Sequence, residues 1–129
     1  MQAILDAAAL VAFLNREPGH EAVADVLAAG AGVCTANMAE TIGILMRHGL
    51  TASEAIEAAE GLPVTMVDLD LDLAKRVGAL EQSTRRFGLS LGDRCCLSLA
   101  ARERLPALTT DRVWSQAGSL IGVEVRLIR

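Results

Sequence analysis

The chain has 129 residues, of which 52% are hydrophobic and 22% charged, a composition that excludes a disordered tail and fits one packed domain over residues 1–129. Its net charge of -4 is not that of a typical nucleic-acid binder, and its longest uncharged stretch, 26–39, is too short and too broken by glycine to span a bilayer. The three cysteines are odd in number and no basic leader opens the chain, so we expect reduced thiols in the cytoplasm.

The first half of the chain predicts short elements separated by glycine or proline. In chain order they are a strand at 3–5, helices at 7–15 and 20–29, a strand at 33–35, and helices at 37–48 and 52–60. Gly49 follows the third of these helices, where a C-terminal glycine is favoured, and Thr51 is placed to cap the fourth.

The second half continues the alternation of strands and helices. Its predicted elements are a strand at 64–67, a long helix at 70–87, a helix at 91–104, a strand at 107–109, a helix at 111–116 and a strand at 123–127. Strands that alternate with helices pair in parallel. We therefore expect an α/β three-layer sandwich, with a central, mainly parallel five-stranded sheet flanked by helices.

Carboxylates stand at four of the predicted helix starts: Asp6, Glu40, Asp93 and Asp111. In an open α/β sheet the carboxyl ends of parallel strands meet at one edge, so these side chains are expected to gather there. Four gathered acids repel one another unless a cation joins them. The pattern therefore indicates a divalent-metal site, and with it phosphate chemistry.

Each acid also has a purely structural interpretation. Asp6 and Asp111 are suited to capping a helix, Asn37-x-x-Glu40 has the capping-box pattern, and Ser90-x-x-Asp93 comes close to it. Caps are common, so one acid alone would indicate nothing more. Four caps at one sheet edge favour a site.

Arginines supply nearly all of the positive charge, and Arg94 and Arg112 directly follow two of the acids. The planar guanidinium can donate two hydrogen bonds to a phosphate, although an ordinary solvated surface is the better explanation of any single arginine. The two phenylalanines, one tryptophan and absence of tyrosine argue against a base-stacking platform for single strands, and recognition of a nucleic-acid backbone by its shape fits better.

Other motifs carry weaker signals. The run 68–72 (DLDLD) lacks the turn glycine of a calcium loop. It also resembles the first motif of haloacid dehalogenase-type phosphatases, but the lysine that they need downstream is matched only by Lys75, a few residues later in the predicted helix. The run is therefore interpreted as a helix start with solvated acids. His20 and His48 have no partner at metal-ligand spacing. No G-x-S-x-G elbow and no phosphate-binding glycine loop is present.

Taken in order, the motifs resemble those of PIN-domain ribonucleases, most closely the VapC type of toxin from bacterial toxin–antitoxin pairs. The first is ILDAAALVAFLNREPG at 4–19, followed by NMAE at 37–40, LSLGDR at 89–94, LTTDRVW at 108–114 and the closing strand VEVRL at 123–127. The resemblance runs the full length of the chain. One departure is Ala8, where such proteins often carry serine, and this change is expected to alter only a hydrogen bond behind the metal ligands.

The resemblance implies a metal-dependent endoribonuclease. Asp6 and Asp93 would be the principal ligands of Mg²⁺, which Mn²⁺ can replace, and Glu40 and Asp111 would complete the pocket directly or through water. Asn37 and Thr109 would position water or a carboxylate, and Arg94 or Arg112 would hold the scissile phosphate. It also implies a homodimer and a small antitoxin that occludes the acidic cleft.

Two alternatives stay open from the sequence: a PIN-like nuclease of RNA maturation or decay without an antitoxin, and a catalytically silent binding module. The sequence identifies neither the RNA that is cut nor the number of metal ions.

Overall fold

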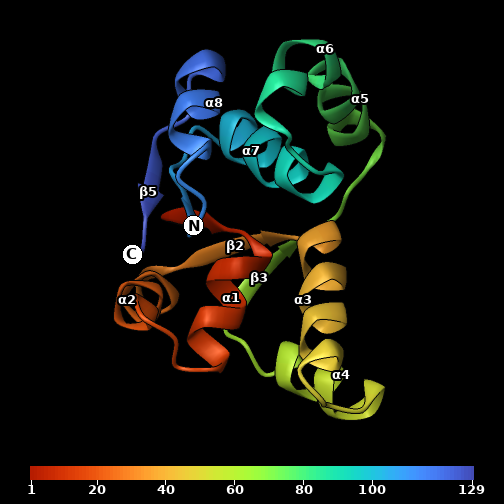
Figure 1. Cartoon of the computed structure of the whole chain (residues 1–129), viewed down its shortest axis with the longest axis vertical. Helices are drawn as coiled ribbons and strands as arrows, with labels where there is room; N and C mark the ends of the chain where they lie inside the picture. Colours follow the sequence, from red (N-terminus) through yellow and green to blue (C-terminus); the bar gives the residue numbers. More distant parts are fainter.

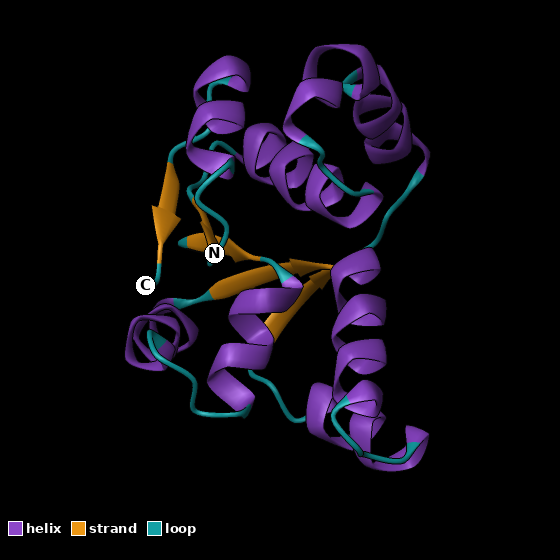
Figure 2. Cartoon of the chain, in the orientation of Figure 1, coloured by secondary structure: helices purple, strands orange, loops and turns teal.

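The computed structural model describes all residues 1–129 and contains one five-stranded sheet with helices on both faces (Figures 1 and 2). The elements are β1 (Ala3–Leu5), α1 (Ala7–Leu14), α2 (His20–Ala29), β2 (Ala31–Cys34), α3 (Thr35–Arg47), α4 (Ala52–Glu60), β3 (Val64–Val67), α5 (Leu71–Ala79), α6 (Glu81–Thr84), the 3-10 turn η1 (Arg85–Phe87), α7 (Leu91–Glu103), β4 (Ala107–Thr109), α8 (Trp114–Ile121) and β5 (Val125–Leu127). The predicted three-layer fold is confirmed.

The strands run in the order β3-β2-β1-β4-β5, and every neighbouring pair is parallel. In β1 the side chains alternate between the two faces, as the period of two requires. Ile4 packs with residues of α5, α7 and α8, whereas Ala3 and Leu5 pack with residues of α1 and α2. All three are buried because both faces of the sheet are covered.

Strand β2 begins two residues earlier than the predicted strand at 33–35, and α3 begins at Thr35 instead of Asn37. Glycine disfavours strands, so Gly32 suggested a loop. Packing decides otherwise, because Gly32 pairs in register with Ile4 and a β-carbon there would collide with the side chains of Ile4 and Met1.

The single helix predicted over 70–87 is wrong, because the chain forms α5, α6 and η1 in its place. The carbonyl of Leu80 accepts hydrogen bonds from the hydroxyls of Thr84 at 2.6 Å and Ser83 at 3.3 Å. Such side-chain donors compete with the helical ladder and bend the chain. Gly78, in the last turn of α5, weakens the helix further.

The helix predicted at 111–116 is displaced, since α8 runs from Trp114 to Ile121. Asp111 does not cap it, because its Oδ1 accepts a hydrogen bond from the Val113 N–H at 3.0 Å and forms a turn before the helix. Gly118 lets α8 approach the chain leading into β5, because a β-carbon there would meet the Val125 side chain and the Val123 carbonyl.

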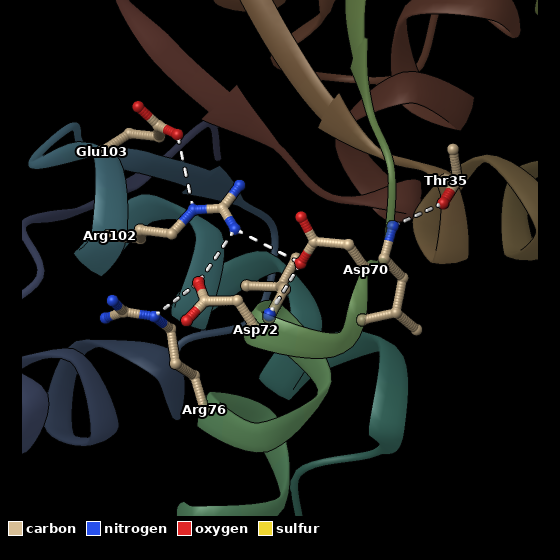
Figure 3. Close-up of polar contacts among 8 residues, drawn as sticks. Thr35, Asp70, Asp72, Arg76, Arg102 and Glu103 are labelled. Atoms are coloured by element: carbon tan, nitrogen blue, oxygen red, sulfur yellow. Dashed lines mark hydrogen bonds and ion pairs between the residues drawn. The ribbon is translucent and has the colours of Figure 1, made fainter.

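A cluster of charged side chains connects helix α5 with α7 through ion pairs (Figure 3). Arg102 lies 3.3 Å from Asp72, 3.6 Å from Asp70 and 3.5 Å from Glu103, and Arg76 pairs with Asp72 at 3.1 Å. Asp70 caps α5 through the Leu73 N–H, so the run 68–72 does begin a helix, with two of its acids paired to arginine.

The three cysteines are all free and buried, with Cys34 at the end of β2 and Cys95 and Cys96 on α7. They lie in the layer between the sheet and α7. None of the helices combines the length and the apolar character that crossing a membrane demands.

Candidate active site

The four predicted acids come from separate segments that the sheet brings to one edge. Asp6 directly follows β1, Asp111 comes two residues after β4, and Glu40 lies on α3, which follows β2. These strands are parallel neighbours, so their carboxyl ends meet at the same edge. Asp93 reaches the group from the first turn of α7, which packs against α3.

Asp6 is the most buried acid of the group, with 5% of its surface exposed. It caps α1, because its Oδ1 accepts the Ala9 N–H at 2.8 Å. Its Oδ2 accepts the Thr109 hydroxyl at 2.6 Å, and that hydroxyl in turn accepts the Asp111 N–H at 3.1 Å. Thr109 therefore links the end of β4 to the carboxylate that follows β1.

Glu40 lies in the second turn of α3, so the capping-box interpretation of Asn37 and Glu40 is wrong. The Asn37 amide instead donates to Oε1 of Glu40 at 2.9 Å and to the Gly92 carbonyl on α7 at 3.0 Å. Asn37 is 1% exposed, and its Oδ1 has no partner within the chain. The amide thus joins an acidic side chain of α3 to the first turn of α7.

Asp93 and Asp111 are held by local hydrogen bonds. The capping box predicted for α7 is confirmed, because Asp93 Oδ2 accepts the Ser90 N–H at 2.9 Å and Ser90 Oγ accepts the Asp93 N–H at 3.1 Å. Asp111 is exposed at the rim. Its carboxylate accepts a single hydrogen bond, from the Val113 N–H to Oδ1, so Oδ2 is free.

The acids act on one another electrostatically. Burial raises the pKa of Asp6 from 3.8 to about 7, against the lowering effect of its hydrogen bonds, and the charges of Asp93 and Glu40 raise it further. Burial likewise raises the pKa values of Glu40 and Asp93, with added repulsion from Asp93 on Glu40 and from Asp111 on Asp93. The pKa values of Asp6, Glu40 and Asp93 are therefore each raised in part by the charge of another acid of the group.

The donor set suits a hard divalent cation, since Mg²⁺ and Mn²⁺ prefer carboxylate oxygens. Each hydrogen-bonded carboxylate oxygen also keeps a second lone pair. As the side chains stand, no three His, Cys, Asp or Glu residues are grouped closely enough to hold a metal ion. The residues fit such an ion in chemistry and charge, and their side chains would have to close around it.

The two candidate phosphate-binding arginines differ in their surroundings. The Arg94 guanidinium donates to the Val77 carbonyl at 3.3 Å and lies 3.4 Å from Glu81, with 15% of the side chain exposed. It is engaged by α5 and α6. Arg112 is exposed beside Asp111 and forms no ion pair.

One residue of the site was not predicted. Gly92 is buried in the first turn of α7, where a β-carbon would collide with the carboxylate of Glu40. Its signal in the sequence is the glycine directly before Asp93, near the start of a helix, where glycine is disfavoured.

Comparison with known proteins agrees with the sequence motifs described above. The family model described as PIN domain matches residues 3–120. Comparison with curated proteins finds no match.

Several solved structures share the fold. DNA-bound VapBC from Salmonella typhimurium has a TM-score of 0.77 at 15% identity, covering 100% of this chain and 99% of that one. VapC20 of Mycobacterium tuberculosis, a toxin that cleaves the sarcin-ricin loop, has a TM-score of 0.76 at 18% identity, covering 91% and 95%. VapBC2 from Rickettsia felis, bound to a promoter DNA fragment, has a TM-score of 0.74 at 14% identity, covering 98% of each chain.

Proposed function

The chain belongs to the PIN domain family, and on this premise we propose that it is a Mg²⁺- or Mn²⁺-dependent endoribonuclease that acts as the toxin of a toxin–antitoxin pair. The observation that carries the proposal is the gathering of Asp6, Glu40, Asp93 and Asp111 from four segments at one sheet edge, with Asp6 buried and its pKa raised to about 7. Keeping mutually repelling carboxylates together costs stability, and such a cost is typical of functional sites.

In this proposal Asp6, Glu40 and Asp93 hold the metal ion, and Asp111 completes the pocket from the exposed rim. Asp6 is oriented for this role because the Ala9 N–H and the Thr109 hydroxyl fix one oxygen each. A bound divalent cation supplies activation of water and neutralises charge that develops on the phosphodiester. The exposed guanidinium of Arg112 is free to contact a phosphate of the RNA, whereas Arg94 supports the packing of α7 against α5 and α6.

The role as a toxin is supported by the kind of protein that shares the fold, since these structures include DNA-bound VapBC proteins, a toxin–antitoxin complex and a VapC toxin that cleaves the sarcin-ricin loop. A surface hollow of about 290 Å³ between α3, α4 and the edge strand β3 adds further support for a protein partner. Most of its lining is apolar: Met38, Ile42, Ile56, Ala59, Leu62, Val64 and Met66. We propose that this partner is a small antitoxin that occludes the acidic cleft. We also expect the toxin to be a homodimer.

The test is to express the chain and its Asp6→Asn variant separately in cells and to map RNA ends. Growth arrest with discrete new 5′ ends only for the wild type supports the proposal. Equal RNA profiles for the two proteins contradict it. The purified wild type could cleave RNA only with Mg²⁺ or Mn²⁺ and yet cause no growth arrest in cells. That result would support the nuclease activity and contradict the role as a toxin.

A further inference from the structure

Glu40 depends on another element for its position. It lies within α3, away from the free backbone N–H groups that hold the carboxylates of Asp6 and Asp93. Its hydrogen bond comes from the side chain of Asn37, whose amide also donates to the Gly92 carbonyl of α7. Both donors of this buried amide are thus used to connect Glu40 with α7.

Gly92 leaves the space that the Glu40 carboxylate occupies. A β-carbon at Gly92 would overlap both carboxylate oxygens and the carbon between them. The helical glycines Gly43 and Gly78 differ, because a β-carbon at either would have no atom within 4 Å. Since alanine is otherwise favoured in a helix, the glycine at this position needs a local reason, and the Glu40 carboxylate is that reason.

We propose that Asn37 and Gly92 are positioning residues for Glu40: the Asn37 amide holds the carboxylate, and the missing side chain of Gly92 lets it lie against the first turn of α7 beside Asp93. The inference rests on the proposed function, since the purpose of this arrangement is to present Glu40 to a divalent cation together with Asp93. Gly92 and Asp93 are consecutive, so one turn of α7 sets the position of both carboxylates.

The arrangement determines where the Glu40 carboxylate points and has a smaller effect on the stability of the fold. The colliding atoms are the far end of a flexible side chain, so Glu40 can rotate away from a new methyl group with little strain in the backbone. Rotation breaks its 2.9 Å hydrogen bond with Asn37 and moves the carboxylate away from the other acids. Gly92→Ala should therefore preserve the fold and weaken cation binding.

The experiment measures Mn²⁺ affinity by titration calorimetry on the full chain for wild type, Gly92→Ala and the matched control Gly78→Ala. Removing support behind a metal ligand lowers affinity by about 10–100-fold, and that loss is expected for Gly92→Ala. Gly78→Ala should bind as the wild type does. Thermal unfolding should show that both alanine variants remain folded.

A second background separates positioning from general damage. In Glu40→Ala protein the carboxylate is absent, so adding Gly92→Ala should cause no further loss of the remaining Mn²⁺ affinity. Asn37→Asp replaces the donating amide group by an acceptor. It should lower the Mn²⁺ affinity of the protein that retains Glu40 and should not lower that of the Glu40→Ala protein.

The outcomes also distinguish this inference from the proposed function. The positioning role is overturned if Gly92→Ala binds Mn²⁺ as tightly as the wild type does. It is also overturned if the loss of Mn²⁺ affinity is equal in the proteins with and without Glu40. In either case, Mn²⁺ binding by the wild type still supports the nuclease proposal. A wild-type chain that binds no Mn²⁺ overturns both.

Discussion

The hydroxyl of Thr109 donates a 2.6 Å hydrogen bond to Oδ2 of Asp6, although the two residues are separated by 103 positions in the sequence. The same oxygen of Thr109 accepts the Asp111 N–H at 3.1 Å. One small side chain at the end of β4 therefore sets the relative positions of two acids.

Replacing Thr109 with valine keeps the shape of the side chain and removes both hydrogen bonds. Buried Asp6 then loses a donor and the Asp111 N–H loses its acceptor, which should lower the free energy of unfolding by about 1–3 kcal/mol. Urea denaturation measures the change. Thr110→Val, at a partly buried neighbouring position, is the control and should change stability by less than about 0.5 kcal/mol. Equal effects at the two positions would contradict the assignment.

The raised pKa of Asp6 predicts how stability depends on pH in the absence of metal. With a pKa of about 7 in the folded chain and 3.8 as the ordinary value, the folded state binds the proton more tightly than the unfolded state. The free energy of unfolding should therefore fall as pH rises between these values. Asp6→Asn removes this contribution, so from about pH 5 to about pH 8 the wild type should lose about 3 kcal/mol relative to the variant.

This difference is measured by urea denaturation of both proteins in a chelating buffer. Because every other ionisable group is common to the two proteins, their effects largely cancel. A constant difference between the proteins across this pH range would show that Asp6 is not a buried acid with a raised pKa.

The close approach of α8 to the chain entering β5 predicts opposite effects for two glycine substitutions. In Gly118→Ala the new methyl group would lie 2.7 Å from the Val123 carbonyl oxygen, so overpacking should cost about 1–3 kcal/mol of stability. In Gly78→Ala the space is open, and the variant should gain about 0.5–1 kcal/mol. Chemical denaturation measures both, and a stabilised Gly118→Ala protein would contradict the packing described here.

The two arginines beside the acids should behave differently when replaced by alanine in the Asp6→Asn protein. Arg112→Ala should weaken binding of a fluorescent single-stranded RNA and reduce the slope of affinity against salt concentration by about one. Arg94→Ala should mainly lower the unfolding free energy, by about 1–3 kcal/mol, because Val77 and Glu81 lose their partner. Fluorescence anisotropy and thermal unfolding separate the two effects, and an RNA-binding loss confined to Arg94→Ala would reverse the assignment.

The sequence predicted the alternation of elements well, because strand β1 and helices such as α7 carry strong local signals. Asp6 and Ser90 were placed correctly as caps, since capping depends on residues three or four positions apart. The start of β2 was missed because Gly32 is explained only by Ile4 on the neighbouring strand. The break after α5 was missed because it depends on which hydroxyls reach the Leu80 carbonyl.

The acids of the site were predicted from their positions after strands, and the structure brings them to one edge. Their detailed surroundings were not predictable. Glu40 looked like a capping residue, and only the packing of α3 on α7 reveals its contacts with Asn37 and Gly92. Asp111 looked like a helix cap, and only the turn before α8 shows otherwise.

The burial of Cys34, Cys95 and Cys96 between the sheet and α7 gives the chain its own reporters of local opening. A thiol reagent cannot reach these sulfur atoms while that layer is closed, so the rate of labelling measures how often α7 separates from the sheet. The chain has no other cysteine, and no engineered label is required. If Mn²⁺ or a bound partner slows the labelling, the layer between the sheet and α7, directly behind the acids, has become more rigid.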